Sequence, residues 1–144
     1  AADRATACVL NGRLYVMGGA GCNKLQVLQW SEENGFSWTV KAGLPNAWRY
    51  SAASVLREGK FWVIGGSDID IPTSSVVIYD IEAESWATGP VLPRAASGPR
   101  ATTLNGEVHV ISQHGCWVRR NAAWVEVPGG PVAMFSACVS SPLC

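Results

Sequence analysis

One pattern recurs along the chain at intervals of 47 residues. Residues 7–19 combine a mostly apolar run, a turn glycine, a second apolar run and a double glycine, and residues 54–66 repeat this order. A third, less regular copy occupies residues 101–111. The turn glycines of the three copies mark the period: Gly12, Gly59 and Gly106. A fixed period of this length is typical of proteins built from stacked copies of one unit, so it constrains the architecture more than any local motif does.

Each copy predicts four short antiparallel β-strands. A glycine preceded by asparagine or glutamate marks the first turn, because tight primed hairpins need the positive φ angles that glycine and asparagine tolerate. The apolar runs after these turns are expected to be strands buried on both faces: residues 14–17, 61–64 and 108–111. Residues 25–30 and 76–80 predict the third strands, and a late tryptophan marks the fourth: Trp38, Trp86 and Trp124. No stretch shows a sustained helical period, so the chain is predicted to be all-β.

The composition excludes several classes of protein. Of 144 residues, 48% are hydrophobic and 15% are charged, which is the opposite of what a disordered chain shows. Eleven basic residues balance eleven acidic ones, so no net field attracts the chain to nucleic acid or to an anionic membrane. The longest apolar runs are far shorter than the ~20 residues of a membrane-spanning helix. We therefore expect neither a nucleic-acid partner nor a membrane partner.

The repeat resembles the kelch repeat of β-propellers, whose period is about 50 residues. The residues that carry the resemblance are double glycines after the second strand, a tyrosine–aspartate pair ahead of a tryptophan, and leucine–proline pairs at the ends of the copies: Gly18-Gly19, Gly65-Gly66, Tyr79-Asp80, Trp86, Leu44-Pro45 and Leu92-Pro93. The double glycines are expected where no side chain would fit or where φ is positive. The third copy departs from the pattern, because Ser112-Gln113 stands in place of the double glycine.

The resemblance implies an all-β, kelch-type β-propeller with about three four-stranded antiparallel blades, which is a partial ring. The predicted repeats cover approximately residues 4–48, 49–96 and 97–131 of a single partial propeller domain, and a fourth begins within 132–144. Kelch propellers usually have six or seven blades, and an open ring would leave apolar blade faces and strand edges exposed. We therefore expect the remaining blades to come from the same longer chain or from a second copy. For the same reason, we expect that the isolated chain is not a well-behaved monomer.

Few residues suggest chemistry. The five cysteines include no Cys-x-x-Cys pair, and Cys8 and Cys138 occupy the same repeat position, so we interpret them as buried free thiols. His109 falls at a packing position of the repeat, and His114 with Cys116 supplies only two metal ligands without a second cluster. We therefore predict no metal site, no cofactor and no catalytic residue.

Residues 31–38 resemble the Asp box of sialidase propellers, although Glu33 stands where that family has aspartate. In that family the box is a structural hairpin between the last two strands of a blade, away from the active site. The resemblance therefore does not establish sialidase chemistry. A fragment of a glycan-acting propeller enzyme, of the sialidase or galactose-oxidase type, stays as an alternative to a binding protein.

Loops supply the candidate binding residues. The kelch resemblance places the loops after the double glycines and the connections between blades on one face of the propeller. These loops hold the side chains that we predict to contact a partner: Lys24, Trp48, Arg49, Tyr50, Asp68, Asp70, Arg94, Arg100 and Trp117. Arginine and aromatic side chains often anchor protein interfaces. The two aspartates would suit a basic partner or calcium, although charged loop residues are usually only solvated.

The resemblance implies a non-catalytic, cytoplasmic protein–protein interaction module. Such a module acts as the substrate-recognition part of a ubiquitin-ligase adaptor or as a structural scaffold in a larger complex. In kelch adaptors, arginines on this face bind acidic peptide motifs, which implies that role for Arg49, Arg94 and Arg100. We expect Arg49 to be exposed, so that Arg49→Ala weakens an acidic ligand by about 1–3 kcal/mol and leaves the folding temperature almost unchanged.

Overall fold

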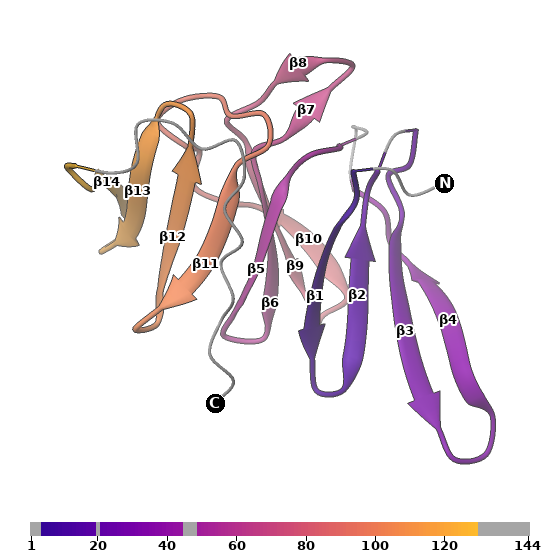
Figure 1. The fold of residues 1–144 in the computed structure, drawn as a ribbon. Coiled ribbons are helices and arrows are strands. Elements are labelled where there is room, and N and C mark those ends of the chain that lie inside the picture. Colours follow the sequence, from indigo (N-terminus) through magenta and orange to yellow (C-terminus); the bar gives the residue numbers. More distant parts are fainter. Residues whose placement is uncertain (1–3, 20, 45–48, 130–144) are drawn as a thin grey trace.

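The structure is a computed structural model that describes residues 4–19, 21–44 and 49–129. The described residues form three four-stranded antiparallel sheets and one two-stranded sheet, and they include no helix (Figure 1). Blade 1 contains β1 (Thr6–Leu10), β2 (Arg13–Met17), β3 (Leu25–Ser31) and β4 (Gly35–Lys41). Blade 2 contains β5 (Ala53–Arg57), β6 (Lys60–Ile64), β9 (Val76–Asp80) and β10 (Ser85–Thr88). Blade 3 contains β11 (Arg100–Leu104), β12 (Glu107–Ser112), β13 (Gly115–Arg120) and β14 (Ala123–Glu126).

Within each blade, the strands follow one another in space in the order in which they occur in the chain. The strands β7 (Ser67–Asp68) and β8 (Ile71–Pro72) lie between β6 and β9 in the chain but are not part of the blade. They form a small sheet that projects from the connection between β6 and β9. The predicted all-β fold with three four-stranded blades in a partial ring is therefore confirmed. The first strand of the predicted fourth copy lies outside the described residues.

The first turn of every blade has the conformation that its sequence predicts. The two central residues have φ angles of 50° and 69° in blade 1, 51° and 69° in blade 2, and 51° and 74° in blade 3. Positive φ at both positions defines a type I′ turn, whose twist matches that of the two strands it joins. Asn11, Glu58 and Asn105 occupy the first of these positions. The repeated glycine at the second position therefore sets the register of the first two strands.

The hydrophobic core lies between the blades. Phe61 and Val63 of β6 pack toward blade 1, in a cluster with Tyr15, Met17, Leu25, Val27, Leu44 and Tyr79. Ile64, on the other face of the same strand, packs toward blade 3, in a cluster with Ala53, Val55, Val76, Leu92, Ala96, Val108, Val110 and Trp117. The prediction of a strand buried on both faces is thus confirmed for β6. In β2 and β12 one face is buried and the other is mostly half-buried, because the described part of the chain places a blade on only one side of each.

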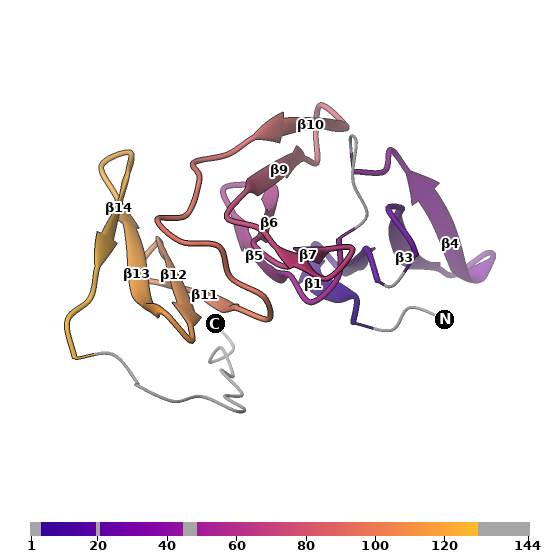
Figure 2. The same cartoon turned by 90° about the horizontal axis from the view of Figure 1, so that it is seen from above.

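The first strands of the three blades meet along one side of the molecule. β5 lies against both β1 and β11, so these strands mark the axis of the partial ring (Figures 1 and 2). Small polar side chains join them: the Thr6 and Ser54 hydroxyl oxygens are 2.5 Å apart, and Thr103 Oγ1 donates to the Leu56 carbonyl at 3.2 Å. The Cys8 thiol is free and half-buried, and burial raises its pKa.

Two of the three late tryptophans connect their blade to the preceding one. The Trp86 indole N–H of β10 donates to the Ala42 carbonyl at 2.7 Å, and the Trp124 indole N–H of β14 donates to the Pro90 carbonyl at 2.9 Å. Both acceptors lie in the connection that leaves the previous blade. Trp38 holds the same place in β4, where no described blade precedes it, and it is 55% exposed. The tryptophan therefore serves the blade-to-blade interface as well as the fourth strand.

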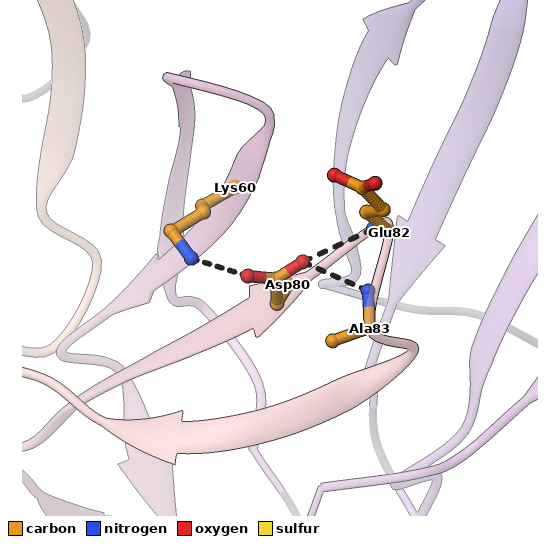
Figure 3. Close-up of polar contacts among 4 residues, drawn as sticks. All are labelled: Lys60, Asp80, Glu82 and Ala83. Atoms are coloured by element: carbon orange, nitrogen blue, oxygen red, sulfur yellow. Dashed lines mark hydrogen bonds and ion pairs between the residues drawn. The ribbon is translucent and has the colours of Figure 1, made fainter.

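Asp80 stabilises the turn between β9 and β10, which we call the outer turn of blade 2 (Figure 3). Its Oδ1 accepts hydrogen bonds from the backbone N–H groups of Ala83 at 3.0 Å and Glu82 at 3.1 Å, and its other oxygen forms an ion pair with Lys60 on β6. The Ala83 N–H and Lys60 hold the pKa of the carboxyl below its ordinary value. The corresponding position of blade 3 has the reverse charges, since the Glu107 carboxylate accepts from Arg120 Nε at 2.8 Å.

Replacing Asp80 tests this arrangement. Asp80→Asn is expected to lower the melting temperature at neutral pH, and Asp80→Ala to lower it further, because asparagine keeps an oxygen that accepts from the turn amides. The pKa of Asp80 is lower in the folded state than its unfolded value of about 3.9, so folding favours the ionised form. The protein with Asp80 is therefore more stable than the Asp80→Asn variant, and this difference in stability is complete above about pH 4. The difference disappears as the pH falls through the folded-state pKa of Asp80. Melting curves are measured for both proteins along a pH series. A difference in melting temperature that stays constant at every pH would contradict this assignment.

No helix in the described residues is long and apolar enough to span a bilayer.

Candidate binding site on the loop face

One end of the blades, which we call the loop face, gathers the long connections. It contains the described parts of residues 18–24, 42–52, 65–75 and 89–99, and the β12–β13 turn. Figure 1 shows these segments at the top of the blades and the tight turns β1–β2, β5–β6 and β11–β12 at the opposite end. The longest of these connections within a blade carries the β7–β8 hairpin. The arrangement of loops that the kelch resemblance implies is thus present.

The double glycines allow the connections between blades to lie directly on the blades. A Cβ atom on Gly18 would lie 2.3 Å from the Arg49 carbonyl oxygen, and the Gly19 N–H donates to that oxygen at 3.2 Å. In blade 2, a Cβ atom on Gly65 would lie 2.8 Å from the Ala96 carbonyl oxygen, to which the Gly66 N–H donates at 2.8 Å. All four glycines have positive φ. Both reasons proposed for the motif, lack of space and positive φ, are therefore confirmed.

Arg49 is part of this scaffold. It is only 8% exposed, and its Nη2 and Nη1 donate to the hydroxyl and carbonyl oxygens of Ser75 at 2.5 and 3.3 Å. Its Nε is buried without a hydrogen-bond partner among the described residues. Burial lowers the pKa of the guanidinium, and the nearby Asp68 carboxylate opposes that shift. The expectation that Arg49 is exposed is wrong, because the connection between blades 1 and 2 turns its side chain onto the β6–β9 loop.

Tyr50 holds the β7–β8 hairpin. Its backbone pairs with Ser67, with the Tyr50 N–H donating at 3.2 Å and the Ser67 N–H donating in return at 2.9 Å. Its hydroxyl hydrogen-bonds the Asp70 carboxylate and accepts from the Asp70 N–H at 2.6 Å. The bond to the carboxylate raises the pKa of the Tyr50 phenol. The Arg4 guanidinium carbon lies 5.6 Å from the ring centroid. Two predicted site residues, Tyr50 and Asp70, are thus in direct contact.

Three of the predicted cationic side chains are exposed on this face. Lys24 ends the connection before β3, Arg94 lies in the connection between blades 2 and 3, and Arg100 begins β11. Arg100 Nη1 donates to the Pro99 carbonyl at 3.4 Å. Arg94 and Arg100 therefore have the exposure that contact with a partner requires.

Trp117 is not a surface residue. The sequence suggested that it ends a loop, but the β12–β13 connection is the short turn Gln113-His114, and Trp117 lies within β13. It is 3% exposed and belongs to the core between blades 2 and 3. Its placement on the loop face is therefore wrong, because the third blade lacks the longer connection that the first two blades have. Trp48 lies outside the described residues.

Two large apolar residues that sequence reasoning passed over are exposed on the hairpin. Ile69 and Ile71 are 74% and 71% exposed, beside the predicted Asp68 and Asp70. Their signal in the sequence was the alternation of aspartate and isoleucine at 68–71, which is unusual for a loop that is only solvated. A pair of large exposed apolar side chains is more informative than charged loop residues are.

The histidine and cysteine side chains that were considered as metal ligands do not form a cluster. Among the described residues, no three His, Cys, Asp or Glu side chains lie close enough to hold a metal ion. His109 lies on β12, 3.9 Å from Glu107, while His114 lies in the β12–β13 turn with its ring beside the Gln113 amide at 3.1 Å. Cys116 is a buried free thiol whose pKa is raised by burial.

A separate cavity of about 250 Å³ lies between blades 1 and 2. It is lined mainly by β2, β3, β4 and β9, and the Lys41–Glu84 ion pair joins the two blades beside it. The Tyr79 hydroxyl is buried without a hydrogen-bond partner among the described residues, and burial raises its pKa. The residues of the cavity come from the blades and the outer turn, so the cavity does not belong to the loop face.

Comparison with known proteins identifies relatives of this repeat. No protein-family model matches the chain. Human Kelch-like protein 33 is 31% identical over 109 residues, which cover 72% of this chain and 20% of that protein. Kelch domain-containing protein 3 from Bos taurus is 26% identical over 141 residues, which cover 84% of this chain and 36% of that protein. An F-box/kelch-repeat protein of Arabidopsis thaliana is 38% identical over 55 residues, which cover 38% of this chain and 14% of that protein.

The fold has a solved counterpart as well. The structure of YjhT matches this chain with a TM-score of 0.65 and 23% sequence identity, over 75% of this chain and 33% of the other. The repeated four-stranded blade, with its double glycine and late tryptophan, makes the molecule a β-propeller segment. The chain belongs to the kelch-repeat family. It spans between 14% and 36% of the length of the three curated relatives described above.

Proposed function

We propose that the chain is a non-catalytic protein-interaction module that binds its partner through the loop face. The observation that carries this proposal is the contrast between the two ends of the blades. One end consists of tight hairpin turns, while the other presents long connections that are held rigidly by the double glycines, Arg49 and Tyr50. A rigid surface loses little conformational entropy on binding, which favours recognition of another protein.

The exposed arginines indicate the chemistry of one contact. Arg94 lies in the connection between blades 2 and 3, and Arg100 begins β11, the strand that follows this connection. Planar guanidinium groups pair with carboxylates through two hydrogen bonds. We propose that they bind an acidic peptide motif of the partner. Arg49 is left out of this contact, because its guanidinium is engaged with Ser75 inside the scaffold.

A second proposal concerns the larger protein or complex in which the module acts. We propose that the module is the substrate-recognition part of a ubiquitin-ligase adaptor in the cytoplasm. The similarity to Kelch-like protein 33 and to an F-box/kelch-repeat protein supports the kelch-repeat module on which this proposal is based. A scaffold in a larger complex and a glycan-acting propeller enzyme are the alternatives. Turnover of a fluorogenic sialoside, or peroxide production from galactose, by the complete protein would favour the enzyme.

Binding of acidic peptides tests the proposed contact. The complete protein that carries these repeats is titrated with an array of Asp- and Glu-containing peptides, and the dissociation constants are compared with those of the Arg94→Ala/Arg100→Ala variant. Loss of charged hydrogen bonds is expected to weaken binding by about 1.5–3 kcal/mol, which is ~10- to 150-fold. Arg13→Ala, at the opposite end of blade 1, is the matched control and should leave the affinity unchanged. Equal affinities for the protein and the double variant would refute the proposal.

A further inference from the structure

The β7–β8 hairpin is an addition to the kelch blade. Blade 1 joins its second and third strands through residues 18–24, and blade 3 does so through the short turn Gln113-His114. Within the described part of the chain, blade 2 alone extends this connection into a separate two-stranded sheet. Figure 1 shows the hairpin projecting from the loop face, beyond the ends of the blade strands. The blade fold therefore does not require it.

The tip of the hairpin has an unfavourable backbone conformation. Ile69 and Asp70 have φ angles of 43° and 64°, which gives the turn the positive φ values of a type I′ hairpin. The first turns of the three blades use asparagine or glutamate followed by glycine, and the β13–β14 turn uses Asn121-Ala122. A β-branched residue at positive φ is a true conformational outlier, and such strain is concentrated at functional sites. The isoleucine at this position therefore needs an explanation outside the fold.

The exposure of the tip makes the same point independently. Ile69 and Ile71 expose most of their side chains to water and are not part of the apolar core between the blades. Residues 67–75 contain two aspartates and no lysine or arginine, so the hairpin carries a formal charge of −2 around its apolar tip. A complementary surface is an apolar pocket bordered by cationic side chains. An anionic lipid surface would instead repel the two carboxylates.

The hairpin is held in place before any partner binds. Tyr50 pairs with Ser67 and hydrogen-bonds Asp70, which joins the hairpin to the connection between blades 1 and 2. The Ser67 hydroxyl donates to the Ser97 hydroxyl at 2.8 Å, which joins it to the connection between blades 2 and 3. The Thr73 N–H donates to the Gly66 carbonyl at 2.9 Å and closes its base. A preorganised apolar anchor is the kind of group that dominates the affinity of an interface.

We propose that the β7–β8 hairpin inserts Ile69 and Ile71 into an apolar pocket on a partner protein, and that lysine or arginine side chains at the rim of that pocket face Asp68 and Asp70. This inference rests on the proposed function of the loop face, but it does not depend on the acidic motif at Arg94 and Arg100. It adds a contact of opposite charge on the same face. It also assigns a function to the alternating isoleucines and aspartates of residues 68–71.

Selection from a library of folded binders tests the proposal. A phage-displayed library of a three-helix scaffold with one randomised face is panned on the complete protein without counter-selection. Most enriched clones are expected to carry apolar residues flanked by lysine or arginine, and to bind the Ile69→Asn/Ile71→Thr variant at least 10-fold more weakly. Asp68→Asn should weaken them less. A library that yields no binders, or binders that are indifferent to the double variant, would overturn the proposal.

Two single substitutions separate binding from folding. Ile69→Gly removes both the strain and one apolar anchor, so it should raise the melting temperature while it weakens the selected binders. Glu58→Asn, in the type I′ turn of β5–β6, should also raise the melting temperature but leave binding unchanged. Binders that respond to Glu58→Asn as they do to Ile69→Gly would show that stability, and not the hairpin, controls affinity.

Two further arms identify the source of any failure. Arg94→Ala/Arg100→Ala should leave the hairpin binders unaffected, whereas acidic peptides should lose affinity only in that variant. Acidic peptides that keep their affinity for this variant would therefore refute the acidic motif and leave the hairpin proposal standing. Sedimentation with phosphatidylcholine–phosphatidylserine vesicles is expected to show no binding. Vesicle binding that disappears in the Ile69→Asn/Ile71→Thr variant would assign the tip to a membrane instead.

Discussion

Gly18→Ala is expected to destabilise the protein by about 2–5 kcal/mol, the largest effect that we predict for a single methyl group. The residue has a φ of 71°, and the new Cβ would lie 2.3 Å from the Arg49 carbonyl oxygen. An L-residue in the left-handed region costs roughly 1–2 kcal/mol, and forcing an atom into a packed site adds about 1–3 kcal/mol. The neighbour cannot move freely, because the Arg49 backbone also accepts the Gly19 N–H. Chemical denaturation of the complete protein measures the loss.

Gly12→Ala is the matched control. Gly12 has nearly the same φ, 69°, but an added Cβ would meet no atom within 4 Å. Only the backbone penalty of roughly 1–2 kcal/mol then applies. The difference between the two variants measures the close approach of the blade-to-blade connection. Equal losses of stability in the two variants would show that glycine is required at this position only because of its positive φ angle.

Arg49→Ala is expected to destabilise the protein by about 1.5–3 kcal/mol and to leave its affinity for acidic peptides unchanged. The guanidinium donates to both the hydroxyl and the carbonyl oxygen of Ser75, and hydrogen bonds from charged groups contribute in this range. Arg49→Lys should recover little of this stability, because one ammonium group cannot reproduce the planar geometry of two parallel donors. This result reverses the expectation from the sequence, which treated Arg49 as an exposed ligand contact.

Arg94→Ala is the control for Arg49→Ala, because Arg94 is exposed on the next blade-to-blade connection. Its removal should change the stability by no more than ~0.5 kcal/mol. Thermal and chemical denaturation of the two variants, together with acidic-peptide titration, separate the roles. An Arg49→Ala protein that keeps its stability and loses its ligand would contradict the structural assignment.

The repeat made the architecture predictable. Turn glycines such as Gly12 and late tryptophans such as Trp86 have strong local causes, namely positive φ and a large apolar side chain with one N–H donor. Because these causes recur at one interval, three blades could be predicted from one. The additional hydrogen bonds from Trp86 and Trp124 to the preceding blade could not be predicted, since they depend on how two units meet in space.

The candidate site was less predictable because it lies where the copies differ. Arg49 and Trp117 were assigned to a surface because they fell in predicted loops and are residue types that anchor interfaces, but burial depends on which neighbours a loop brings near. Trp117 became a core residue once the third blade shortened its connection to a tight turn. Ile69 was overlooked because the alternation of aspartate and isoleucine at residues 68–71 was interpreted only through its two carboxylates.

Hydrogen–deuterium exchange of the complete protein, with and without a peptide selected from the acidic array or a binder from the scaffold library, tests the central claim most directly. If the loop face is the binding surface, the acidic peptide should slow exchange in residues 93–100 and the scaffold binder in residues 67–75. The tight turns at the opposite end, residues 57–60 and 104–107, should exchange at unchanged rates. Protection confined to those turns, with residues 67–75 and 93–100 unaffected, would contradict the account.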